Sequence, residues 1–185
     1  MSFYHVPSQI LNPLFTRNLL TGHIVLPTDV DGQLEAQLKA QGIKSITRAT
    51  DITQHTDLCW WAGLPKFDWA LAITQGNTET LDWVLTPGYE MAEKGLIILD
   101  RVSFLEPTRK RVDFLQEATL SNLIILNPRP EFRADQRKAK DSVTSAWYVF
   151  DGTYTTNKGT TIDFDVNWQR PKLLSKSERT SAITA

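Results

Sequence analysis

The sequence lacks several features that would direct an interpretation on their own. Its 185 residues contain a single cysteine, so an intramolecular disulfide is excluded. Three histidines are scattered at positions 5, 23 and 55, which argues against a metal site. No apolar run approaches the roughly 20 residues that a membrane-spanning helix needs. The net charge is −1, so nothing draws the whole chain to nucleic acid or to an anionic membrane.

Three sequence signals are also missing. There is no glycine-rich phosphate loop ending in Lys-Ser or Lys-Thr, and no serine at a nucleophile elbow. The N-terminus has no basic region followed by an apolar run, so a signal peptide is not indicated and a cytoplasmic protein is expected.

What the sequence does contain is typical of a globular protein. Apolar residues make up 41% of the chain and charged residues 22%. The length suits one domain with a substantial core. We expect a single domain over residues 1–170 and a flexible, polar tail over 171–185.

Strand and helix patterns alternate along the chain. Short apolar runs predict strands at 23–27, 43–47, 69–74, 96–99, 123–126 and 146–150, with an alternating edge strand at 162–166. Helical patterns occur at 7–20, 34–41, 79–93 and 107–117, and Pro87-Gly88 is expected to kink or split the third. The segment 55–66 reads as a loop. This order predicts an α/β sandwich around a mainly parallel sheet.

Parallel sheets bind ligands at the carboxyl ends of their strands, and two acidic segments fall there. The first expected strand is followed by Asp-Val-Asp-Gly at 29–32, which leads into a helix. Asp51 closes the second strand about 20 residues later, where Rossmann-like folds place a carboxylate on ribose hydroxyls. Each segment also has a simpler interpretation: the first caps a helix, and Asp51 is a solvated loop acid.

Basic residues gather in two places. Residues 108–111 (Thr-Arg-Lys-Arg) open a helical pattern, and the loop 127–144 carries Arg129, Arg133, Arg137 and Lys138. These side chains suit DNA phosphates or another acidic partner. Acidic residues in the same loop leave open the alternative of a solvated, mixed-charge loop.

In order and spacing, these segments resemble the small class I DNA N6-adenine methyltransferases of phages and bacteria. The resemblance spans about residues 3–152 and rests on short segments. They are Phe-Tyr-His-Val-Pro at 3–7, Leu-Pro-Thr-Asp-Val-Asp-Gly at 26–32, Ala-Thr-Asp-Ile at 49–52, Thr-Asp-Leu at 56–58, the strand at 67–74, and the segments 101–106, 127–132 and 146–150. It implies a three-layer sandwich with a methyltransferase-like Rossmann sheet and a terminal antiparallel strand. It also implies that S-adenosylmethionine would be bound by Tyr4, Pro27, Asp29, Asp31, Gly32, Asp51 and Asp57.

The chain departs from this family at its chemical centre. The family's catalytic loop reads Asn/Asp-Pro-Pro-Tyr/Phe; its first residue accepts from the target amine and its aromatic ring stacks on a flipped adenine. The corresponding residues here are Gln75, Gly76, Asn77 and Thr78. In the cofactor loop, Leu26 stands where the family has a glutamate, and Val30 stands where it has its first glycine.

Three hypotheses follow. The first is a degenerate homologue of a DNA adenine methyltransferase, of phage or mobile-element type, that acts as a non-catalytic binding or structural protein with weak or lost S-adenosylmethionine binding. The second is an active methyltransferase with an altered loop, acting on DNA or another substrate. The third is an unrelated nucleotide-binding α/β protein.

Overall fold

The computed structural model describes residues 5–51, 54–74, 76–106, 108–132, 143–155, 159–166 and 168–169. The expected tail at 171–185 lies outside these residues. Within them the chain forms one sheet of seven strands in the order β2-β1-β3-β4-β6-β5-β7. The strands are β1 Ile24–Leu26, β2 Ile46–Arg48, β3 Trp69–Ile73, β4 Gly95–Arg101, β5 Leu120–Leu126, β6 Ser145–Asp151 and β7 Thr161–Asp165.

The strand directions confirm the sequence prediction. β1 pairs in parallel with β2 and β3, and β3 pairs in parallel with β4. β6 runs antiparallel to both of its neighbours, β4 and β5. β7 pairs in parallel with β5 and forms one edge of the sheet, as its alternating sequence indicated. The sheet is therefore mainly parallel, with one antiparallel strand inserted between β4 and β5.

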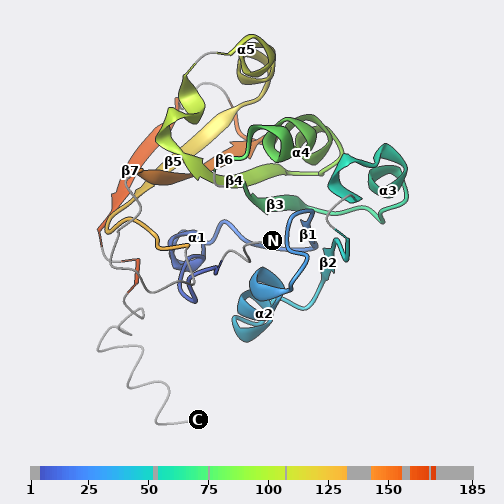
Figure 1. Ribbon diagram of the computed structural model, residues 1–185, viewed down its shortest axis with the longest axis horizontal. Coiled ribbons are helices and arrows are strands. Elements are labelled where there is room, and N and C mark those ends of the chain that lie inside the picture. The colour runs from blue at the N-terminus through green and yellow to red at the C-terminus, as the bar shows by residue number, and fades with distance from the viewer. Residues whose placement is uncertain are drawn as a thin grey trace.

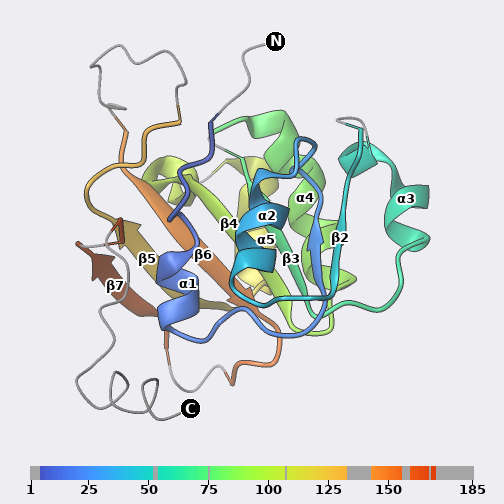
Figure 2. The same cartoon turned by 90° about the horizontal axis from the view of Figure 1, so that it is seen from below.

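Helices cover both faces of the sheet and make three layers (Figure 1). α1 Asn12–Thr16 and α2 Gln33–Ala40 lie on one face, and α3 Leu58–Ala62, α4 Thr78–Glu90 and α5 Arg109–Glu117 lie on the other. Two apolar clusters fill the spaces between sheet and helices. β4 and β6 are buried along almost their whole length because helices cover them on both sides. The same layers are seen from below in Figure 2.

α4 differs from the expectation, because it continues through Pro87 without a break. Proline removes the bond that would go to the carbonyl of Trp83, but Trp83 lies on the exposed side, where water can replace the lost donor. Gly88 then lets the helix approach the sheet. A Cβ at Gly88 would lie 3.0 Å from Leu96 Cδ1 and 3.2 Å from the Cβ of Ala70.

Two further element predictions were wrong in extent. The segment expected as a loop at 55–66 contains a 3-10 turn at Gln54–Thr56 and the helix α3, whose Trp61 is buried against the sheet. The first helix is only five residues long, because it begins beside Pro13 and the chain turns at Asn18 with φ of 54°. Among the described residues, no helix has the length and apolarity to cross a membrane.

Candidate functional site

The carboxyl ends of β1, β2, β3 and β4 lie at the same edge of the sheet, because these four strands are parallel. The loops that follow them therefore meet there, as in other open α/β sheets. One contact joins the loop after β1 to the last residue of β3: the backbone amide of Ile73 donates to the hydroxyl of Thr28 at 3.2 Å. This edge is the candidate site.

Asp29, in the loop after β1, is buried. Its Oδ1 accepts from the amide of Leu34 at 2.9 Å, and its Oδ2 accepts from the amide of Glu35 at 2.8 Å. Burial raises the pKa of this carboxyl, and the two amide bonds oppose that shift. Both oxygens thus bind the N-terminus of α2, so the helix-capping interpretation describes what Asp29 does in the fold.

The rest of this loop is more accessible. Pro27 is buried, whereas Asp31 is exposed and accepts from the backbone and side-chain amides of Gln33. Gly32 has φ of 75°, a left-handed conformation that favours glycine, and is the N-cap residue that precedes α2. Asp31 and Gly32 are therefore the part of the loop that a ligand can reach.

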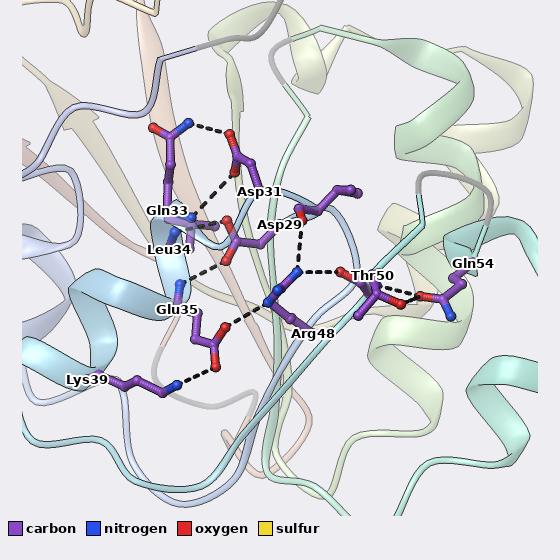
Figure 3. Close-up of polar contacts among 11 residues, drawn as sticks. Asp29, Asp31, Gln33, Leu34, Glu35, Lys39, Arg48, Thr50 and Gln54 are labelled. Carbon is purple, nitrogen blue, oxygen red and sulfur yellow. Dashed lines mark hydrogen bonds and ion pairs between the residues drawn. The ribbon is translucent and has the colours of Figure 1, made fainter.

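Arg48, the last residue of β2, was not singled out from the sequence. Its Nε donates to Glu35 Oε2 at 2.7 Å, and its Nη1 donates to the carbonyl of Val30 at 2.8 Å and to that of Ala49 at 3.3 Å (Figure 3). A Cβ on Gly32 would lie 3.6 Å from Arg48 Nε. The guanidinium therefore ties the β1–α2 loop to the end of β2 and lies against Gly32.

The two further acids predicted to contact the cofactor lie on the loop after β2. Asp51 is exposed, and its amide donates to Gln54 Oε1. The amide of Thr50 donates to the same oxygen (Figure 3). Asp57 caps α3, since its Oδ1 accepts from the amide of Cys59 at 2.8 Å. Asp51 thus lies at the predicted edge, while Asp57 has a structural role as a helix cap.

The loop after β3 corresponds to the expected catalytic loop, and the structure describes it from Gly76 onward. Gly76 has φ of 77°. Asn77 is the N-cap of α4, its Oδ1 accepting from the amide of Thr80 at 3.2 Å. Thr78 is the first residue of that helix and is exposed. Gln75 lies outside the described residues.

Asp100, near the end of β4, is a buried acid that sequence reasoning missed. Its carboxylate accepts from the Thr74 hydroxyl at 2.5 Å, from the Arg101 amide at 2.5 Å and from the backbone of Gly76. Burial raises its pKa, against the lowering effect of these bonds. The signal in the sequence was an aspartate that directly follows the apolar run Leu96–Leu99, at the carboxyl end of a buried strand.

The remaining predicted positions are only partly described. Arg129 is exposed after β5. Tyr4, Arg133, Arg137 and Lys138 lie outside the described residues. In the described part of the chain, no three histidine, cysteine or acidic side chains gather in a way that would hold a metal ion.

Comparison with known proteins yields similarity in structure only. No protein-family model matches the sequence, and no curated protein matches it. A modification subunit described as part of a type I restriction enzyme of Vibrio vulnificus superposes with a TM-score of 0.54 at 9% identity, over 98% of this chain and 52% of that one. A protein of Listeria monocytogenes, described as a class I S-adenosylmethionine-dependent methyltransferase, superposes with a TM-score of 0.52 at 10% identity, over 97% of this chain and 70% of that one.

These likenesses establish the fold class. The chain has the Rossmann-like fold of class I methyltransferases, a mixed sheet between two layers of helices. It spans about half the length of the Vibrio subunit.

Proposed function

We propose that this chain is a degenerate relative of DNA adenine methyltransferases that acts by binding rather than by methyl transfer. The observation that carries the proposal is the backbone of the loop after β3. Gly76 has φ of 77° and its backbone binds Asp100. Proline is fixed near φ of about −65° and has no N–H. The proline that the resembling family has at this position is therefore incompatible with the conformation of this loop.

The next two loop residues support the same conclusion. The amide side chain of Asn77 is engaged in capping α4. Thr78 occupies the position of the stacking aromatic and has no ring. Base stacking on an aromatic side chain is worth about 1–3 kcal/mol, and small errors in alignment lower the rate of transfer by orders of magnitude. We infer that an extruded adenine is not held in line with a methyl donor here.

The contacts within the β1–α2 loop are an argument that the cofactor binds only weakly. Asp29 has both oxygens bound to α2, and Arg48 lies against Gly32 while it holds the carbonyl of Val30. We propose that S-adenosylmethionine, if bound, lies over Asp31 and Gly32 with Asp51 near its ribose.

One observation favours the second candidate, an active methyltransferase with an altered loop. Asp100 places a buried carboxyl beside Gly76, and burial raises its pKa. A carboxyl with a raised pKa at the carboxyl edge of a Rossmann-like sheet is a group that could accept a proton from an amine or hydroxyl substrate.

Two measurements on the full chain separate these candidates. Calorimetric titration with S-adenosylmethionine and with its demethylated product tests cofactor binding, and we expect weak binding of both. Asp51→Asn is expected to weaken it further, whereas Glu106→Gln, the same change of charge after β4, is not. Incorporation of labelled methyl groups into mixed-sequence DNA tests catalysis, and we expect none. Robust label on adenine that is abolished by Gln75→Ala or Asp100→Asn would replace the binding proposal with the active enzyme.

DNA is the partner that we propose for the loop 127–144, of which Arg129 is the described basic residue. A salt-dependent affinity for DNA supports this proposal, because phosphate contacts weaken as counterions compete. An affinity that does not change between low and high salt contradicts it.

A further inference from the structure

A groove between α4 and α5 lies apart from the candidate site. Its volume is about 510 Å³, and it is partly open to solvent. The described residues that line it are Asp82, Trp83, Leu85, Thr86, Tyr89, Glu90, Asp113, Phe114, Glu117 and Ala118. These include four carboxylates, and no lysine or arginine.

The topology places this groove near the amino ends of the parallel strands, whereas the candidate site lies at their carboxyl ends. α4 begins at Thr78, beside the site, and its far half lies over the starts of β3 and β4, where Gly88 packs against Ala70 and Leu96. The end of α5 at Glu117 leads directly into the start of β5. A ligand in the groove would therefore leave the candidate site open. α4 and α5 lie on the same face of the sheet in Figure 1.

Three aromatic side chains, Trp83, Tyr89 and Phe114, are among the residues that line the groove. The rings of Tyr89 and Phe114 meet edge to face at 5.8 Å, and the Tyr89 hydroxyl accepts from the amide of Thr119 at 3.2 Å. Trp83 is different, since 42% of its surface is exposed although it is a large apolar side chain on a helix. The groove thus combines a pair of aromatic rings in contact with each other and an indole that is accessible to solvent.

The carboxylates determine what can bind there. The carboxylates of Glu90, Asp113 and Glu117 are exposed. Asp113 and Glu117 are one turn apart on α5, where like charges repel each other unless a cation lies between them. The guanidinium of arginine satisfies both features of the groove, because it pairs with carboxylates and stacks on an indole face. Phosphate groups are repelled, so nucleic acid is not the occupant.

We propose that the groove between α4 and α5 is a docking site for an arginine-bearing segment of a partner protein. The partner's arginine lies over Trp83 and between the carboxylates of α4 and α5, and its apolar residues pack against Phe114 and Tyr89. This proposal does not depend on whether the chain transfers methyl groups.

Fluorescence anisotropy with a labelled helical peptide tests the proposal. The peptide carries two arginines and two leucines on one face, and a second peptide has glutamates in place of the arginines. We expect the arginine peptide to bind the full chain in a salt-sensitive manner, and the glutamate peptide not to bind. Trp83→Ala and the double variant Glu90→Gln/Glu117→Gln should each weaken binding by about fivefold or more.

A matched control removes two charges outside the groove. Glu93→Gln/Glu106→Gln changes the net charge by the same amount, with Glu93 facing Lys66 at 3.6 Å and Glu106 following β4. It should leave peptide binding within twofold of the original protein. Circular dichroism verifies that each variant is folded. Absence of binding at millimolar peptide, equal binding of the two peptides, or an equal loss in the control pair overturns the proposal.

Discussion

The carboxylate of Asp100 at the end of β4 accepts a hydrogen bond from the backbone of Gly76, in the loop that follows β3. The same carboxylate accepts from the hydroxyl of Thr74. The loop after β3 is thereby joined to the end of the neighbouring parallel strand β4, beside the residues that the sequence resemblance predicts as the catalytic loop. The conformation of this loop is held by a buried acid, and that conformation excludes a proline at position 76.

Asp100→Ala is expected to lower the free energy of unfolding by about 2–3 kcal/mol at pH 7, because the hydroxyl and amide donors lose their acceptor. Urea unfolding measures the loss. The pKa of Asp100 is raised in the folded state, so the folded protein holds this proton more tightly than the unfolded chain. Its contribution to stability therefore falls as the pH rises above about 3.8 through the folded-state pKa.

The loss of unfolding free energy caused by Asp100→Ala should consequently be larger near pH 4 than near pH 7. The other titratable groups are the same in both proteins, so their contributions cancel in the difference. A loss that grows with pH would mean that the three donors outweigh burial and stabilise the anion.

Gly76→Ala is expected to destabilise the protein more than Gly42→Ala. Both glycines have positive φ, 77° and 87°, so both substitutions carry a backbone cost of about 1 kcal/mol. A Cβ at Gly42 meets nothing within 4 Å, whereas one at Gly76 lies 2.6 Å from Arg101 Nε. Thermal unfolding of the two variants isolates the cost of displacing Arg101. Equal losses would show that the Arg101 side chain moves away freely.

The family-like loop made by Gln75→Asn, Gly76→Pro, Asn77→Pro and Thr78→Tyr is expected to gain no methylation activity. Position 76 cannot keep φ of 77° with proline, and the bond to Asp100 is lost. Labelled methyl transfer to DNA measures the outcome, with unfolding curves to establish that the variant folds. Activity in this variant would show that the loop rearranges and that the cofactor loop still works.

Arg48 and Glu35 are expected to show a coupling energy of about 0.5–1.5 kcal/mol in a double-mutant cycle. Arg48 Nε lies 2.7 Å from Glu35 Oε2, and both side chains are partly buried, with 30% of Arg48 and 22% of Glu35 exposed. Lys39 binds the same carboxylate but is 60% exposed, so its coupling to Glu35 should be smaller, about 0.3–0.5 kcal/mol. Urea unfolding of the single and double variants measures both. Equal couplings would contradict a special role of Arg48 in holding the loop.

Arg48→Ala is also expected to tighten the binding of S-adenosylmethionine by roughly 3- to 10-fold, about 1 kcal/mol, because it removes the guanidinium that lies beside Gly32 and leaves more room for the ligand there. Asp51→Asn is expected to weaken it. Calorimetry measures both. Tight binding by the original chain that survives Asp51→Ala would show that the cofactor does not use this edge as proposed.

Local sequence patterns were sufficient to predict the sheet. Continuous apolar runs such as Leu96–Leu99 are typical of strands covered on both faces, and alternation at 162–166 indicated an edge strand. Both patterns depend on side-chain periodicity alone, which is independent of what the strand packs against. The order of strands and helices then restricted the topology to a mainly parallel sandwich.

The roles of the acids at the candidate site could not be predicted in this way. Asp29, Asp31, Asp51 and Asp57 are alike in sequence, since each follows a strand or precedes a helix. Only the tertiary structure shows that Asp29 is buried with both oxygens bound to α2, that Asp57 caps α3, and that Asp31 and Asp51 are exposed. Each of these outcomes depends on where distant backbone amides lie.

Arg48 and Asp100 illustrate the same limit. The sequence by itself placed an arginine directly after the predicted strand at 43–47 and an aspartate directly after the apolar run Leu96–Leu99. It did not determine their partners, because Val30 and Glu35 lie 18 and 13 residues away from Arg48, and Thr74 lies 26 residues away from Asp100. Parallel pairing of β1 with β2 and of β3 with β4 brings these residues together. Such contacts between residues that are distant in sequence form only when the chain folds. The tertiary structure therefore decided which polar groups hold the loops and which remain accessible to a ligand.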